Sequence, residues 1–277
     1  MADRERPVEE ALVIETRVAK VGQGEHHFCG YPATSKLLGR QSSAGMLLLA
    51  VGAGPGSAED HAVLNDVAVA LTAGDPRAWP MKIARLVASY GDFFAGWAAS
   101  SLFLPEAQLG PSTSGQAADW LHGVAALADD PVVRGERFDA VVREVLLGRQ
   151  RLPGFGVPFR DVDERLAALR GALERRGRCQ RRFWQIMDAV ATIVRRERQL
   201  EPNIGLGLAA CLLDLGLQPP QVPRLLAALA AHMFVANAAE GADQAAAVLR
   251  ELPLDRVDYQ GPEPRQSPRA RAKANER

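Results

Sequence analysis

Cysteine is scarce in this chain of 277 residues, and its scarcity argues against two classes of site. The three cysteines, Cys29, Cys179 and Cys211, are odd in number and far apart. A disulfide framework needs paired cysteines, and a structural zinc site needs closely spaced cysteine or histidine ligands. We therefore expect no metal site, no required cofactor, and a reducing cytoplasm as the setting.

The chain also lacks an excess of charge, since 33 Lys and Arg balance 33 Asp and Glu. A nucleic-acid-binding protein usually carries a basic surface, so this balance argues against that class. Long apolar runs are missing too, because Met46–Val51 and Ala98–Leu104 are far shorter than the roughly 20 residues that span a bilayer. The charged N-terminal residues do not resemble a signal peptide. We expect neither nucleic acid nor a membrane as a partner.

Hydrophobic residues make up 47% of the chain, enough for a substantial core, and most of them have helical spacing. Only Leu12–Val21 alternates like a strand. Dense alanine at Ala227–Ala247 predicts a close helix–helix seam, inside one subunit or between two. The predicted helices are Ala33–Gly39, Ser42–Val51, Ala58–Ala73, Met81–Phe103, Gly115–Ala128, Arg134–Leu147, Asp161–Arg176, Arg182–Gln199, Ile204–Leu215, Pro219–Glu240 and Asp243–Glu251.

Three short motifs carry most of the functional information. Residues 153–157 read Pro-Gly-Phe-Gly-Val and resemble the Pro-Gly-Phe-Gly-His loop of citrate synthases. Residues 201–206 read Glu-Pro-Asn-Ile-Gly-Leu and resemble the Pro-Asn-Val-Asp-Phe segment of the same enzymes. Residues 109–115 read Leu-Gly-Pro-Ser-Thr-Ser-Gly and resemble Gly-Pro-Leu-His-Gly-Gly. With weaker matches from about residue 18 to residue 264, the chain resembles the citrate synthase and citryl-CoA lyase family.

The resemblance implies an all-α, two-domain fold. We expect an N-terminal strand-like segment over residues 1–29, followed by a large helical domain over residues 30–110 and 212–262. A small helical domain would occupy residues 111–211. Residues 263–277 are rich in Pro, Arg, Gln and Ser and are expected to form a disordered basic tail.

The resemblance also implies that the usual catalytic groups have been replaced. In the family one histidine holds the enol of acetyl-CoA, an aspartate removes the methyl proton, and a second histidine polarises the carbonyl of a 2-oxo acid. Their places are taken here by Thr113, Gly205 and Val157 respectively. Valine and glycine cannot transfer a proton, and a positioned acid or base contributes roughly 10² to 10⁴ in rate. The usual condensation is therefore expected to be absent.

A binding site for CoA or acyl-CoA is the function that these losses leave possible. In the family the Pro-Gly-Phe-Gly turn contacts the adenine end of CoA through its main chain, which implies the same for Pro153, Gly154, Phe155 and Gly156. Arg165 matches an arginine that holds a carboxylate, and other arginines over residues 175–182 could hold phosphates. The alternatives are a turn kept for packing and a solvated arginine face.

Two other groupings offer altered chemistry. Asp75 and Thr113 could form a new site, in which a carboxylate activates a hydroxyl or water. Asp119 and His122 stand three apart on one predicted helix and are either an acid–base pair or an ordinary surface pair.

The sequence thus favours a non-catalytic or regulatory acyl-CoA-binding subunit. We expect a homodimer, or a heteromer with a citrate-synthase-like paralogue. The alternative is a lyase, hydrolase or acyltransferase of altered chemistry that acts on a CoA thioester or a related carboxylate.

Overall fold

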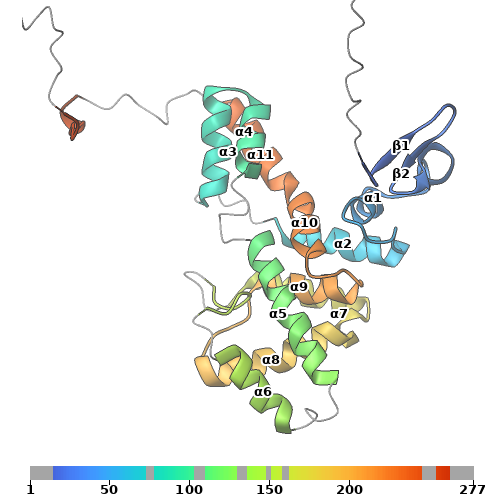
Figure 1. Cartoon of the computed structure of the whole chain (residues 1–277). Helices are drawn as coiled ribbons and strands as arrows, with labels where there is room; N and C mark the ends of the chain where they lie inside the picture. Colours follow the sequence, from blue (N-terminus) through green and yellow to red (C-terminus); the bar gives the residue numbers. More distant parts are fainter. Residues whose placement is uncertain are drawn as a thin grey trace, which may run out of the picture.

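The computed structural model describes residues 15–72, 78–102, 110–129, 136–147, 151–157, 162–244 and 254–262 (Figure 1). Within these ranges the chain forms eleven α-helices and a small antiparallel sheet, so the prediction of an all-α fold with a short strand segment is confirmed. Asp75 and residues 263–277 lie outside the described residues, as does most of the predicted helix Asp243–Glu251. The division into a large and a small domain stays a prediction.

The α-helices are α1 (Ser43–Ala50), α2 (Ala58–Ala70), α3 (Trp79–Tyr90), α4 (Phe93–Leu102), α5 (Pro111–Asp129), α6 (Glu136–Leu147), α7 (Glu164–Arg175), α8 (Arg182–Arg198), α9 (Ile204–Asp214), α10 (Gln221–Leu229) and α11 (Ala231–Ala242). The strands are β1 (Ala19–Val21), β2 (His26–Phe28) and β3 (Tyr31–Pro32). Three short helical turns complete the described elements: η1 (Ala33–Leu37), η2 (Arg178–Gln180) and η3 (Leu254–Arg256).

Two predicted long helices are each divided in two, and that part of the prediction was wrong. The stretch 81–103 breaks after Tyr90, where the Asp92 carboxylate accepts a hydrogen bond from the Ala95 N–H (2.8 Å) and starts α4. The stretch 219–240 breaks at Ala230, which separates α10 from α11. In both places the apolar spacing continues across the break, so periodicity alone did not reveal it.

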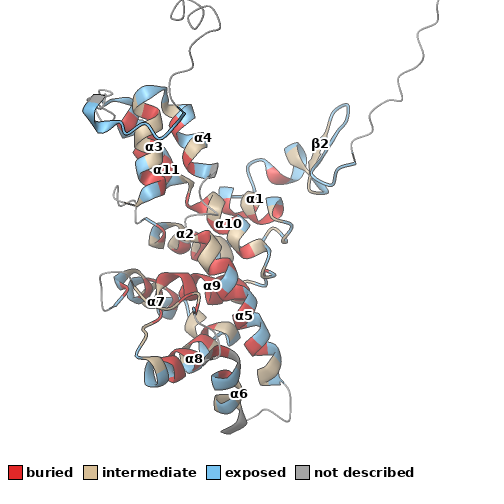
Figure 2. Cartoon of the chain, turned by 60° about the vertical axis from the view of Figure 1, so that its left-hand side comes forward, coloured by how far each residue is buried: buried red, intermediate tan, exposed pale blue. Residues whose placement is uncertain are grey.

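The main core lies between α5, α8, α9 and α10, with α2, α6 and α7 packed around it (Figure 2). Helix α9 is its centre, because every residue from Ile204 to Leu213 is buried. Trp184 and Met187 of α8 fill the space beside it and are fully buried. A helix buried on all sides must be apolar on all sides, which explains why the sequence of α9 has no polar face.

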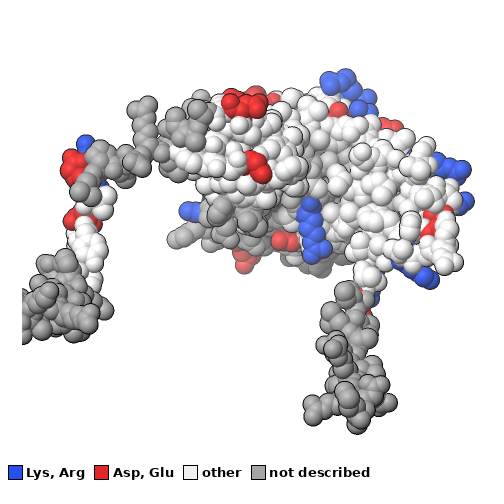
Figure 3. All heavy atoms as spheres, turned by 90° about the horizontal axis from the view of Figure 1, so that it is seen from above, with Lys and Arg blue, Asp and Glu red and all other residues white. Residues whose placement is uncertain are grey.

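Helices α3, α4 and α11 form a separate bundle at one end of the molecule (Figure 1). Small residues line its interior: a Cβ on Gly96 would lie 2.5 Å from the Ala84 carbonyl oxygen, and one on Gly241 would lie 2.6 Å from that of Arg85. This packing shows that the predicted alanine-rich seam exists within the subunit. Figure 3 views the molecule from this end and shows mostly uncharged side chains.

Several large apolar side chains of this bundle are exposed, although Phe234 and Met81 are buried. Phe94 is 70% exposed, and Trp79, Tyr90, Trp97 and Val235 are also exposed. We call these five residues the aromatic face. A bundle with small residues inside and aromatic residues outside leaves apolar surface uncovered by the described residues of its own chain.

The N-terminal sheet has the order β1-β2-β3, with Lys20 opposite His27 and Phe28 opposite Tyr31. Of the predicted strand Leu12–Val21, only residues 19–21 form a strand within the described range, and β2 and β3 were not predicted because they are so short. The Glu25 carboxylate closes the sheet onto η1 by accepting hydrogen bonds from Thr34 and Ser35, which lower the pKa of Glu25 to about 2.

The stretch Gln221–Ala242 is long and apolar enough, by length and composition alone, to cross a membrane. Many of its apolar side chains pack inside the protein, however. Leu225 and Leu226 of α10 belong to the main core, and α11 packs against α3 and α4. The core helix of a folded domain meets the same criterion, so this stretch does not overturn the expectation of no membrane segment.

Candidate functional site

Two helix N-termini meet where the resemblance implied an active site. Helix α5 begins at Pro111, a residue suited to the first helical position because it has no N–H to satisfy. Helix α9 begins after Asn203, whose side-chain oxygen accepts a hydrogen bond from the Gly205 N–H (2.9 Å). The two helices pack along each other, which brings Ser114 of α5 beside Gly205 of α9.

The loop of residues 153–157 is fastened to the segment that precedes α9. Phe155 and Pro202 form an antiparallel bridge, in which the Gly156 N–H donates to the Glu201 carbonyl (2.8 Å) and the Asn203 N–H donates to the Gly154 carbonyl (2.9 Å). The Asn203 amide nitrogen also donates to the Gly156 carbonyl (2.9 Å). The predicted loop and the predicted Pro-Asn segment therefore form one rigid unit.

Both loop glycines have left-handed backbone conformations, but the space around them differs. Gly154 has φ +92°, and a Cβ there would lie 2.8 Å from the Leu206 side chain. Gly156 has φ +80°, and a Cβ there would meet nothing within 4 Å. Gly154 is thus explained by packing, which was the alternative reading of the loop, whereas Gly156 has open space beside it.

Most main-chain groups of the loop are already paired. The Trp120 indole N–H donates to the Pro153 carbonyl (3.0 Å), and the Trp120 ring stacks on Phe155 with centroids 6.2 Å apart. The Phe155 N–H donates to the Leu152 carbonyl (3.1 Å). Among the described residues, the structure gives no partner to the Gly154 N–H, the Phe155 carbonyl, or the N–H and carbonyl of Val157.

The three residues that the resemblance matches to the family's catalytic groups lie at two helix starts and in the loop. Thr113 lies in the first turn of α5, and Gly205 lies in the first turn of α9. A Cβ on Gly205 would lie 3.0 Å from the Asn203 side-chain oxygen and 3.3 Å from the Ser114 hydroxyl. Val157 ends the described part of the loop.

Ser114 is a residue that sequence reasoning missed. Its side chain is fully buried, and its hydroxyl has no hydrogen-bond partner. The available signal was that Ser114 stands where the family's motif has the first glycine of its Gly-Gly pair. Serine in that place means that part of the space beside Gly205 is already occupied.

Arg165, predicted to hold a carboxylate or phosphate, instead holds a carboxylate of its own chain. Its Nε and Nη2 donate to the two Asp163 carboxylate oxygens at 2.9 and 2.8 Å. Asp163 also caps α7 through the Arg165 N–H and accepts a hydrogen bond from the Ile204 N–H (2.9 Å). Burial opposes ionisation of Asp163, but these hydrogen bonds lower its pKa below the usual value.

The other predicted phosphate-binding arginines are largely paired as well. Arg176, Arg178 and Arg182 each form a salt bridge, the partners being Asp66, Asp60 and Asp129. Arg175 and Arg181 are exposed, and the described part of the chain shows no carboxylate bound to either. Most of these arginines are therefore surface residues whose charges are paired with carboxylates of the same chain.

The proposed acid–base pair is not assembled. Asp119 and His122 are both exposed on α5, and no hydrogen bond joins them in the described structure. The His122 ring instead stacks on Phe183, with centroids 6.1 Å apart. No group of three or more His, Cys, Asp or Glu side chains suited to a metal occurs among the described residues.

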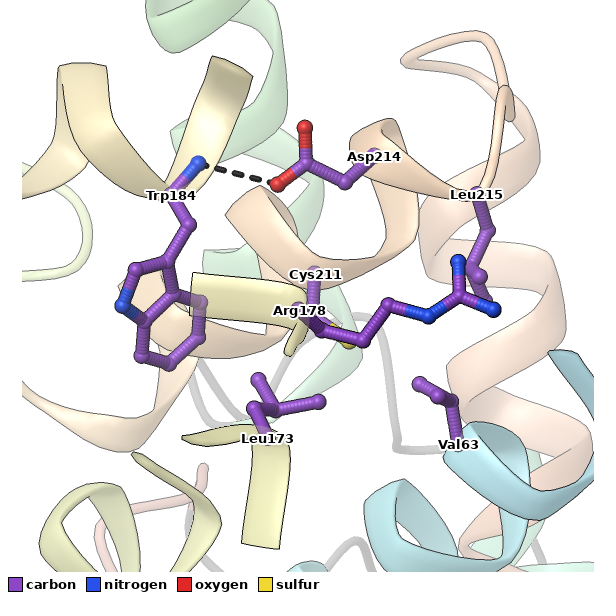
Figure 4. Close-up of a pocket in the computed structure, with 7 residues that line it drawn as sticks. All are labelled: Val63, Leu173, Arg178, Trp184, Cys211, Asp214 and Leu215. Carbon is purple, nitrogen blue, oxygen red and sulfur yellow. Dashed lines mark hydrogen bonds between the residues drawn. The ribbon is translucent and has the colours of Figure 1, made fainter. Parts of the chain in front are cut away.

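A small cavity lies between α2, α7, α8 and α9 (Figure 4). Its volume is about 10 Å³, which holds about one water molecule, and its lining is mainly apolar. Asp214 beside it accepts hydrogen bonds from the Phe183 and Trp184 N–H groups (2.8 and 3.0 Å), although burial raises the pKa of Asp214. Burial likewise raises the pKa of Cys211. The cavity is too small for a nucleotide or an acyl chain.

No protein-family model and no curated protein sequence matches this chain. Solved structures do match it. Citryl-CoA lyase from Hydrogenobacter thermophilus is similar with a TM-score of 0.74 and 21% identity, over 93% of this chain and 98% of that one. ATP citrate lyase from Methanothrix soehngenii, solved with citrate and coenzyme A, is similar with a TM-score of 0.67 and 16% identity. That match covers 95% of this chain but only 43% of the ATP citrate lyase chain.

These likenesses extend over nearly the whole chain. The identities are low, so what they establish is the arrangement of the helices rather than a shared reaction. The prediction of the fold is confirmed: the chain has the citrate-synthase-like helical fold that citryl-CoA lyase has.

Proposed function

We propose that this protein is a non-catalytic subunit that binds CoA or an acyl-CoA and regulates or supports a partner. The observation that carries the proposal is the rigid unit made by residues 153–157 and 201–205, which is intact although Thr113, Val157 and Gly205 carry no proton-transfer group. Proteins of this fold include a citryl-CoA lyase and an ATP citrate lyase that was solved with (3S)-citryl-CoA, and citryl-CoA is a CoA thioester.

The loop offers an edge suited to a purine. The Phe155 carbonyl is an acceptor and the Val157 N–H is a donor, and the residue between them, Gly156, uses both of its main-chain groups on the opposite side. Adenine presents a donor and an acceptor on one edge, so such a main-chain pair is complementary to it. The open space at Gly156 supports close approach of a flat ring. Among the arginines over residues 175–182, Arg175 and Arg181 have no carboxylate bound to them in the described part of the chain.

The test is isothermal titration calorimetry with CoA and with acetyl-CoA on the purified full chain. We expect weak binding that persists in part at high salt, because main-chain contacts are not screened whereas arginine–phosphate contacts are, with a screening length of about 8 Å at physiological ionic strength. Gly156→Leu should abolish the binding. Gly216→Leu is the matched control, because Gly216 also has a left-handed conformation (φ +86°) and open space but lies outside the loop.

Three outcomes contradict the proposal. Absence of heat with both CoA species would remove ligand binding and leave a structural subunit. Equal loss in the Gly156 and Gly216 variants would mean that backbone strain, about 1–2 kcal/mol for a side chain in this conformation, rather than the loop, is responsible. Consumption of the thioester during the titration would favour an enzyme of altered chemistry.

The partner in this proposal binds through the aromatic face. Full burial of an aromatic side chain covers about 150–250 Å², and these five residues are 38–70% exposed, so they would supply part of the roughly 800 Å² per partner that a stable interface needs. We take a second copy of the chain as this partner, because twofold homodimers are the commonest soluble oligomers. A citrate-synthase-like paralogue is the other candidate. The scattered cysteines remain consistent with a cytoplasmic setting.

A further inference from the structure

A hydroxyl, an imidazole and a carbonyl oxygen are joined in a line at the start of α1 and α2. The Ser42 hydroxyl lies 2.9 Å from Nδ1 of His61, and Nε2 of His61 lies 2.7 Å from the Pro55 carbonyl oxygen. A carbonyl oxygen can only accept, so Nε2 carries a proton that it donates to Pro55. In the neutral ring Nδ1 is then an acceptor, and it receives the Ser42 proton.

The chain holds this imidazole in place with two glycines. A Cβ on Gly45 would lie 2.8 Å from Nε2 of His61, and one on Gly56 would lie 3.3 Å from the same atom. Gly56 has φ +70°, a conformation that other residues avoid. The ring is half-buried in this slot, and Ser42 is exposed.

Ser42 is also placed where negative charge on its oxygen is favoured. It is the N-cap of α1, and its hydroxyl oxygen accepts a hydrogen bond from the Gly45 N–H (3.1 Å). The N-terminus of a helix stabilises a neighbouring anion. The main-chain N–H groups of Ser43 and Ala44 belong to the first turn and have no partner inside the helix. The described structure gives them none elsewhere, so they are free to meet an oxyanion.

We propose that Ser42 is a nucleophile activated by His61, and that this site accepts an acyl group from an oxygen ester rather than from the CoA thioester of the proposed function. The Ser42 oxygen forms a bond to the acyl carbon while its proton passes to Nδ1 of His61. The carbon–oxygen bond of the ester then breaks, and the leaving alcohol takes that proton. Water then gives a proton to Nδ1 as its oxygen attacks the acyl carbon, the bond from that carbon to Ser42 breaks, and the proton returns to the Ser42 oxygen as the carboxylic acid leaves. Throughout, Nε2 keeps its proton on the Pro55 carbonyl, which orients the ring.

This activity goes beyond the proposed CoA binding and does not rest on it, because none of its residues belongs to the loop or to α9. The substrate class follows from the surroundings. The Gln41 side chain covers Gly45 on one side, while Ser42 is exposed, so the acyl carbon of an ester can reach the Ser42 oxygen from solvent.

The test is labelling of the full chain with a fluorophosphonate, followed by peptide mass spectrometry. The probe transfers its phosphonyl group to a nucleophilic serine as fluoride leaves. We expect one adduct, on Ser42. His61→Gln keeps a donor to Pro55 but is not a base, and it should slow labelling about 10²-fold. Ser42→Asn keeps the helix cap and removes the nucleophile, so its adduct should vanish.

Two control variants carry the same Ser→Asn and His→Gln substitutions at residues outside the proposed site. Ser57→Asn replaces the N-cap serine of α2, whose hydroxyl bonds Asp60 rather than a histidine. His232→Gln alters a second hydroxyl–imidazole pair among the described residues, made with Thr72 (3.1 Å). Both should leave labelling at Ser42 unchanged. An unmodified Ser42 peptide, or equal labelling of wild type and His61→Gln, overturns the proposal. A thermal melt of each variant separates loss of the nucleophile from loss of the fold.

Discussion

Replacing Asp163 with alanine should destabilise the protein far more than replacing any exposed carboxylate. The Asp163 side chain is 1% exposed and accepts four hydrogen bonds, from the Arg165 N–H, Nε and Nη2 and from the Ile204 N–H. It therefore holds the start of α7 and the start of α9 together. The substitution leaves a buried N–H unsatisfied and removes the partner of an arginine.

The magnitude follows from these losses. Removing one partner of a buried ion pair costs about 3–5 kcal/mol, and an unsatisfied buried N–H costs about 1–3 kcal/mol. Arg165 is 35% exposed, so water compensates part of its loss, and we expect about 3 kcal/mol in total. Asp188→Ala is the matched control: Asp188 also binds an arginine, Arg170, through both oxygens, but its side chain is 42% exposed. It should cost about 0–1 kcal/mol.

The assay is urea unfolding monitored by circular dichroism. The free energies of unfolding of the variants are compared at a common m value, the slope against urea concentration. A difference of less than about 1 kcal/mol between the Asp163 and Asp188 variants would refute the reasoning, because it would mean that burial does not decide the strength of these pairs.

The pH dependence of the free energy of unfolding gives a second test of the role of Asp163. The folded-state pKa of Asp163 is below its unfolded value, so its contribution is fully present above the unfolded pKa of about 4 and is lost as pH falls through the folded pKa. Wild type should therefore lose more stability than Asp163→Ala when the pH is lowered from about 5 to 2. Parallel pH profiles of the two proteins would contradict this.

The remaining predictions concern the altered site and the aromatic face. Gly205→Asp should destabilise the chain, because its Cβ enters a space of 3.0–3.3 Å between two oxygens, and adding Ser114→Gly should recover part of the loss in a double-mutant cycle. Incubation with acetyl-CoA and oxaloacetate should give no citrate in a coupled assay; turnover at ordinary rates, about 1 to 10³ per second, would disprove the assignment of the three replaced positions. In sedimentation the pure chain should exceed its monomer mass of 29.8 kDa. Phe94→Asp should reduce it to the monomer, whereas Val69→Asp, at a site on α2 that is 72% exposed, should not; a monomeric wild type would contradict the homodimer.

Periodicity predicted where helices lie but not where long ones break. The apolar spacing of α3 continues into α4, and only the Asp92 hydrogen bond to the Ala95 N–H shows that a new helix starts there. The three motifs located the candidate site, because each keeps the glycine or proline that its backbone needs. The buried hydroxyl of Ser114 and the bond between Ser42 and His61 depend on segments that meet only in the folded chain. The pattern of neighbouring residues in the sequence does not predict such contacts between distant segments.

The bundle of α3, α4 and α11 separates two tasks that most protein surfaces combine. Gly96 and Gly241 set the distance between its helices from inside, whereas the side chains of the aromatic face are 38–70% exposed. If that face binds a partner as proposed, a substitution at Phe94, its most exposed residue, would change the binding with little effect on the helix spacing. After a gene duplication, two copies could lose affinity for themselves and gain it for each other through a few outward changes, while each kept its own fold intact.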